Sequence, residues 1–115
     1  MRPVRVVVPA GPGGTSPIVP IDFYEVGTIT IGVDPITGAP STAVQYTLAD
    51  IFDPVALAAA TWITAGAPLA AVVGSAAAAL CDANGNAIHP TAIRGVNSVA
   101  GATSRLTVIV SGLRA

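Results

Sequence analysis

Glycine and proline recur at short intervals along this chain and limit how long any regular element can be. The 115 residues include 12 glycines and 10 prolines, and valine, isoleucine and threonine fill much of the space between them. Glycine and proline weaken or interrupt helices, whereas β-branched residues pack well on a pleated surface. The pattern therefore predicts many short strands separated by turns, and it argues against a helical protein.

Several segments alternate apolar and polar residues, as a strand with one buried face does. In residues 28–33, for example, Ile29, Ile31 and Val33 alternate with two threonines and a glycine. Together with two further short segments, these make seven or so short strands, a spacing that predicts an all-β fold, a single antiparallel β-sandwich or jelly-roll-like domain. The predicted strands are residues 4–8, 21–24, 28–33, 44–48, 61–64, 91–99 and 105–110.

Turn-forming residues separate these strands. Residues 34–40 and 50–54 have the composition of turns, and the Asn84–Gly85 pair predicts a hairpin turn at 82–86. The alanine-rich residues 69–80 fit two structures. Alanine favours a helix, but the valines and the glycine inside the segment weaken that prediction, so a short helix and an extended segment both stay open.

The chain divides by composition near residue 16. Residues 1–16 are predicted to form an N-terminal arm with a Gly/Pro loop, and residues 17–115 the β-sandwich domain. An extended arm is able to add a strand to a neighbouring subunit, and the glycines that follow it provide reach. Val4, Val6 and Val8 are therefore candidate partner contacts.

Residues 54–81 carry no charge, although they are mainly Ala, Gly, Thr and Val. About 20 apolar residues suffice to cross a bilayer, so the length permits a membrane span. However, these side chains are poorly hydrophobic, Pro68 interrupts the run, and Asp53 and Asp82 flank it where Lys or Arg would mark a cytoplasmic end. We expect no membrane span, but apolar surface that is covered by other copies or another protein.

The charged and nucleophilic residues exclude several classes of function. Only 10% of residues are charged and the net charge is −1, which leaves no broad basic surface for nucleic acid. Cys81 is the single cysteine and His89 the single histidine, so no disulfide, cysteine metal cluster or catalytic motif is recognisable. The glycines at 11–14 lack the lysine of a phosphate-binding loop. We predict a protein that is not an enzyme and has no cofactor or metal.

Two aspartates and two arginines are the charged residues most open to a specific role. Asp50 and Asp53 are predicted to cap a turn and to pair with Arg94 or Arg105. Arg94 lies inside a predicted strand, where an arginine often pairs with a carboxylate in a partly buried site. With Trp62, these two arginines complete the candidate partner contacts.

Four short stretches, in order over most of the chain, carry a family resemblance. They are residues 17–24 (PIVPIDFY), 44–54 (VQYTLADIFDP, followed by Trp62), 90–94 (PTAIR) and 104–110 (SRLTVIV). Together they resemble a family of small virion structural proteins of tailed bacteriophages, from which the alanine-rich insert at 69–80 departs. The resemblance implies a non-enzymatic part of the virus particle.

The resemblance and the apolar composition together predict a head decoration (cement) protein. It would be made in the host cytoplasm and would lie on the capsid surface of the virion, bound to the major capsid protein and to copies of itself as a trimer or dimer. A tail or neck component is one alternative. A β-sandwich module that binds a host glycan is another, and it would depend on the few aromatic residues, which are Phe23, Tyr24, Tyr46, Phe52 and Trp62.

Overall fold

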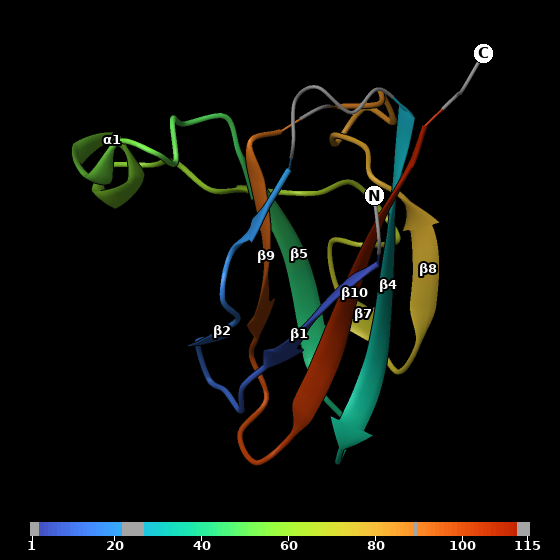
Figure 1. Cartoon of the computed structure of the whole chain (residues 1–115). Helices are drawn as coiled ribbons and strands as arrows, with labels where there is room; N and C mark the ends of the chain where they lie inside the picture. Colours follow the sequence, from blue (N-terminus) through green and yellow to red (C-terminus); the bar gives the residue numbers. More distant parts are fainter. Residues whose placement is uncertain (1–2, 22–26, 89, 113–115) are drawn as a thin grey trace.

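In the computed structural model the chain forms two antiparallel sheets packed face to face (Figure 1). The structure describes residues 3–21, 27–88 and 90–112. The first sheet has the strand order β1-β10-β4-β8 and the second β2-β9-β5-β6, with β3 also paired to β9 and β7 to β5. The predicted all-β sandwich is confirmed. Its elements are β1 (Val4–Val8), β2 (Gly14–Thr15), β3 (Val19–Pro20), β4 (Gly27–Thr37), β5 (Ser41–Thr47), α1 (Pro54–Ala58), β6 (Ile63–Thr64), β7 (Val72–Val73), β8 (Ala76–Ala79), β9 (Ala92–Asn97) and β10 (Thr103–Gly112).

The core lies between the two sheets, where the alternating pattern places the apolar side chains. On β4, Ile31 and Val33 are fully buried, and they lie opposite Val108 and Leu106 of β10, which are buried as well. The residues between them face outward, so the predicted alternation holds along both long strands. From the remaining elements, the fully buried apolar side chains include Val8, Val19, Val44, Leu69 and Ile93.

Buried polar side chains form hydrogen bonds at two places in the fold. The hydroxyl groups of Thr42 on β5 and Ser104 on β10 lie 2.8 Å apart and so link the two sheets. Asn97 donates to the carbonyl oxygen of Ala102 and accepts from the backbone N–H of Val99 at 2.9 Å. No buried side-chain nitrogen or oxygen in the described residues lacks a hydrogen-bond partner, which removes the main cost of placing polar groups in a core.

The N-terminal segment is part of the sandwich and does not extend away from it, which corrects the expectation of an arm. β1 pairs with β10 of the same chain along its whole length, and β2 pairs with β9. The hydroxyl group of Ser16 accepts a hydrogen bond from the backbone N–H of Gly95 at 2.9 Å. Because these contacts bind residues 4–16 to both sheets, the change in composition near residue 16 is not a structural boundary.

The alanine-rich segment is extended, which settles the choice that the sequence left open. Residues 76–79 form β8 and pair with β4, and Val72–Val73 form β7 and pair with β5. Gly74 lies between them with a φ of 83°, a conformation that side chains disfavour. Hydrogen bonds to neighbouring strands therefore outweigh the helix preference of alanine here.

Two predicted turns have different outcomes. β4 continues to Thr37 through the predicted turn at 34–40, and its Pro35 lies opposite Ser104 where the register of β10 shifts. Proline is tolerated at such an irregularity because no regular ladder hydrogen bond is lost. The turn at 82–86 forms as predicted, with one carboxylate oxygen of Asp82 accepting from the backbone N–H groups of Asn84 and Asn86.

The predicted strand at 21–24 falls mostly outside the described residues. Within residues 3–21, 27–88 and 90–112, no helix reaches the length and apolar character of a bilayer span.

Candidate functional site

Of the predicted partner contacts on β1, Val8 points into the sandwich. It is fully buried, and Val4 and Val6 are partly buried against the same core. Val8 is therefore unable to contact a partner, and this prediction was wrong because the alternation of β1 turns these valines inward. The outward residues of the strand are Arg5 and Val7, the latter 53% exposed.

Arg94 and Trp62 lie together on the outer face of the second sheet. The Arg94 Nε on β9 donates to the Gln45 side-chain oxygen on β5 at 2.9 Å, and its guanidinium carbon lies 4.2 Å from the centre of the Trp62 ring. The register explains the contact, because Gln45 faces Arg94 on one side and Thr64, two residues after Trp62, on the other.

This cluster differs from the expected ion pair. The partners of Arg94 are an amide and an indole, and no carboxylate contact is found for it in the described part of the chain. Burial lowers the pKa of Arg94 below its ordinary value, because removing water disfavours the charged form. The guanidinium covers one face of Trp62, so the cluster fixes β9, β5 and β6 to each other and leaves less aromatic surface for a ligand.

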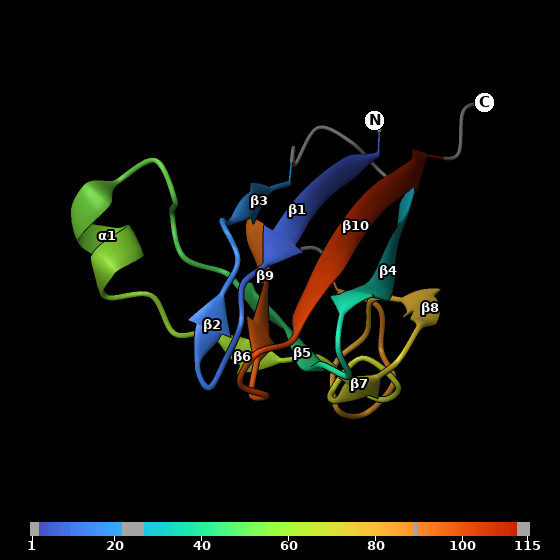
Figure 2. The same ribbon diagram turned by 90° about the horizontal axis from the view of Figure 1, so that it is seen from below.

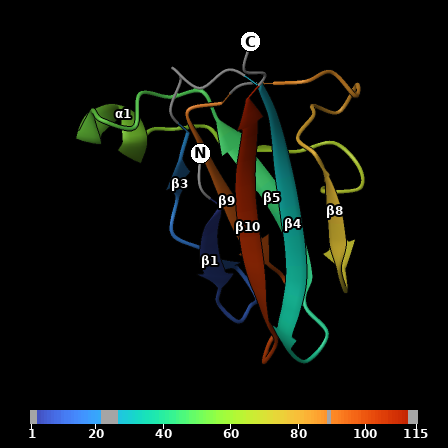
Figure 3. The ribbon, with the colours of Figure 1, turned by 45° about the vertical axis from the view of Figure 1, so that its right-hand side comes forward.

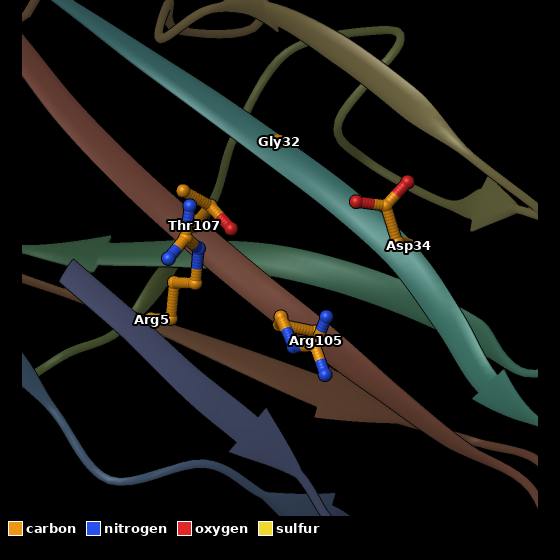
Figure 4. A pocket seen from close by; sticks show the side chains of 5 residues that line it. All are labelled: Arg5, Gly32, Asp34, Arg105 and Thr107. Carbon is orange, nitrogen blue, oxygen red and sulfur yellow. The ribbon is translucent and has the colours of Figure 1, made fainter. Parts of the chain in front are cut away.

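Arg105 lies on the opposite side of the molecule, on the outer face of the first sheet. There, Arg5, Gly32, Asp34, Arg105 and Thr107 line an open hollow of about 720 Å³, which we call the basic hollow (Figure 4).

The strand register builds the basic hollow in two rows. Arg5, Thr107 and Gly32 lie opposite one another across β1, β10 and β4, and Arg105 lies opposite Asp34 in the next row. Gly32 forms the floor, because a Cβ atom added there would meet only the Cβ of Thr107, at 3.9 Å. The hollow thus combines two guanidinium groups, one carboxylate and open space.

Residues 48–62, which contain α1, extend away from both sheets, and we call them the projecting segment (Figures 1, 2 and 3). α1 contributes no buried residue. Large apolar side chains of the segment face solvent instead, with Leu48 64%, Phe52 81% and Val55 77% exposed. Of these, Leu48 and Phe52 line one small hollow, and exposed apolar groups that lie close together mark interaction sites.

The tip of the projecting segment is held by its own aspartates. The Asp50 carboxylate accepts from the backbone N–H of Phe52, and the Asp53 carboxylate caps α1 by accepting from the N–H of Val55, each at 3.0 Å. The prediction that both cap turns is thus confirmed. We did not predict a helix here, although Asp53 before Pro54 is a helix start signal that would have revealed it.

A small hollow of about 220 Å³ lies where the projecting segment joins the sandwich. It is lined by Ile21, Leu48, Asp50, Ile51, Phe52 and Thr91. The single proton of the Thr91 hydroxyl is shared between the carbonyl oxygens of Ala49, at 2.6 Å, and Thr47, at 3.1 Å, which fixes the start of the segment.

The described residues contain no group of three or more His, Cys, Asp or Glu side chains placed to hold a metal ion. The outer surface instead presents the exposed apolar side chains of the projecting segment and the charged side chains of the basic hollow. Comparison of the chain with protein-family models, with curated proteins and with solved structures gives no match.

Proposed function

We propose that this chain is a structural protein of a phage virion, and specifically a head decoration protein that binds the outside of the major capsid shell as a homo-oligomer. The observation that carries the proposal is the projecting segment, whose apolar side chains have no cover within their own chain. The resemblance of four sequence stretches to phage virion proteins supports the proposal that the particle is a phage virion.

The energetics favour attachment in many copies. Fully burying one large apolar side chain contributes about 1.5–3 kcal/mol, so Leu48, Phe52 and Val55 together would contribute roughly 5–9 kcal/mol. Association itself costs an estimated 4–15 kcal/mol. A single segment therefore binds weakly, whereas an oligomer whose copies attach to a repeating shell at several points gains from simultaneous attachment.

The test is the location and number of copies in purified virions. Cryo-electron microscopy should find the chain on the outer shell, at a copy number that follows the capsomer lattice. A few copies confined to one vertex or to the tail would refute the head assignment and favour the tail or neck alternative.

A binding assay on capsids that lack the chain tests the role of the projecting segment. Phe52→Ser removes its most exposed apolar side chain and should weaken capsid binding by at least about tenfold, as loss of an interface aromatic does. Val73→Ser is the matched control, because Val73 is 75% exposed and lies on β7, outside the segment. Equal binding by both variants and the native chain would contradict the proposal.

The glycan-binding alternative depends on Trp62, which lies beside the polar groups of Gln45 and Arg94 as sugar-binding tryptophans often do. Stacking of Arg94 on the ring weighs against it. Binding on a glycan array that is lost in Trp62→Ala would favour this alternative over the decoration role.

A further inference from the structure

We propose that copies of this chain bind one another by placing the tip of the projecting segment, Asp50 to Asp53, in the basic hollow of the next copy. The inference rests on the proposed function in one respect, namely that the projecting segment is adhesive. It adds the partner, which is a second copy, and the surface that receives the segment.

Charge complementarity identifies the partner. The described residues include three arginines and four aspartates. Two of the three arginines, Arg5 and Arg105, line the basic hollow, and two of the four aspartates, Asp50 and Asp53, hold the tip of the projecting segment. Asp34 also lines the hollow, so among the described residues the hollow carries two positive charges and one negative charge, a net charge of +1, while the tip carries two negative charges. Such an arrangement steers one surface towards the other.

The shapes also match. Phe52 lies between the two aspartates and is 81% exposed. The basic hollow is open over Gly32 on β4, where Thr107 separates Gly32 from Arg5 and where Arg105 and Asp34 form the next row (Figure 4). An aromatic ring that enters this space would lie beside guanidinium groups, which favour the face of an aromatic ring.

The aspartates are arranged for this contact. Asp50 and Asp53 each use one carboxylate oxygen to hold the backbone of the tip, at 3.0 Å. A carboxylate has about four acceptor sites, so each can also accept from an arginine. Because the tip is already ordered, less conformational freedom is lost when it binds.

The two surfaces cannot satisfy each other within one copy. The projecting segment leaves the second sheet between β5 and β6 and points away from the body, whereas the basic hollow lies on β1, β10 and β4 of the first sheet (Figures 1 and 2). The contact therefore joins the projecting segment of one copy to the basic hollow of another. A variant that keeps only one of these two surfaces is still able to bind a copy that keeps the other.

This property gives a direct test by sedimentation velocity on the full chain. Phe52→Ser disables the segment, and Gly32→Val fills the hollow without changing any charge. Each variant alone should self-associate at least about tenfold more weakly than the native chain. A mixture of the two should form a 1:1 complex that grows no further, because each variant supplies the surface that the other lacks.

Matched controls separate the contact from general effects. Ala77→Val also introduces a valine side chain. Ala77 pairs with Gly32 from the neighbouring strand β8 but does not line the hollow. Val73→Ser removes an apolar side chain of similar exposure from another surface. Both should associate like the native chain, and 0.5 M NaCl, at which the Debye length is only roughly 4 Å, should weaken the native contact.

The results distinguish this inference from the proposed function. A native chain that stays monomeric, or a mixture of the two variants that forms no complex, would overturn the inference. Loss of capsid binding in Phe52→Ser with native self-association would also overturn it, while supporting the decoration role. Self-association that follows the predicted pattern, in a chain that binds no capsid, would support the inference and refute the decoration role.

Discussion

The packing of β1 against β9 makes a quantitative prediction at Gly95. A Cβ atom added at this residue would lie 2.8 Å from Cγ2 of Val8 and 3.4 Å from Cγ2 of Thr42. Val8 is fully buried, so it has no free space into which to move. Overpacking of this kind costs about 1–3 kcal/mol, and the smaller conformational freedom of unfolded alanine offsets about 0.4–1 kcal/mol. Gly95→Ala should therefore lower the free energy of unfolding by about 1–2 kcal/mol.

A second substitution tests whether the clash with Val8 is the cause. Val8→Ala alone removes two buried methyl groups and should cost roughly 1–3 kcal/mol. In the double variant the new methyl at residue 95 occupies space that Val8 has left. The double variant should then lose less stability than the two single changes added together, by about 1 kcal/mol.

Urea unfolding followed by the fluorescence of Trp62 measures these changes, at a concentration low enough to keep the chain dissociated. Gly32→Ala is the control, since its Cβ would meet only the Cβ of Thr107, at the ordinary contact distance of 3.9 Å. If Gly95→Ala is tolerated as well as Gly32→Ala, or if the effects at residues 8 and 95 simply add, β1 does not pack on β9 of its own chain.

Three further predictions concern contacts elsewhere in the fold. Thr42→Val leaves the buried Ser104 hydroxyl without its partner and should cost about 1–3 kcal/mol in chemical denaturation, most of which Ser104→Ala in the same chain should restore. Arg94→Lys keeps the charge but loses the planar stacking on Trp62, so unfolding should become easier by about 0.5–1 kcal/mol and the tryptophan emission should shift. Replacing residues 49–60 with a short hairpin loop should change stability by no more than about 1 kcal/mol, because β5 and β6 are already antiparallel partners, yet it should abolish self-association in sedimentation.

The sequence predicts the central strands well because their structure depends on local alternation and burial. The apolar positions of β4 and β10 follow a period of two, and both strands are buried on one face as that period requires. The bounds differ where tertiary structure intervenes. β4 runs on through Pro35 because the facing strand shifts its register there, and nothing within residues 34–40 encodes that shift.

The candidate sites were less predictable because they depend on contacts between distant residues. Val8 lies in a segment whose sequence predicts an extended N-terminal arm. Only the pairing of that segment with β10 shows that Val8 belongs to the core. Arg94 finds an amide and an indole because the register of β9, β5 and β6 brings Gln45 and Trp62 to it. The basic hollow likewise exists only because the register of β1, β10 and β4 brings Arg5, Arg105 and Asp34 together beside Gly32.

The directions of the two adhesive surfaces bear on the size of the assembly. The projecting segment points sideways from the sandwich (Figure 1), whereas the basic hollow lies on the outer face of β1, β10 and β4. Two copies joined by this contact are therefore rotated relative to each other, and the same rotation is repeated at each further contact. A repeated rotation closes a ring when it divides a full circle, and otherwise gives a helical filament. A closed ring would present its free surfaces together on one side, which is the arrangement that attachment to a symmetric shell requires.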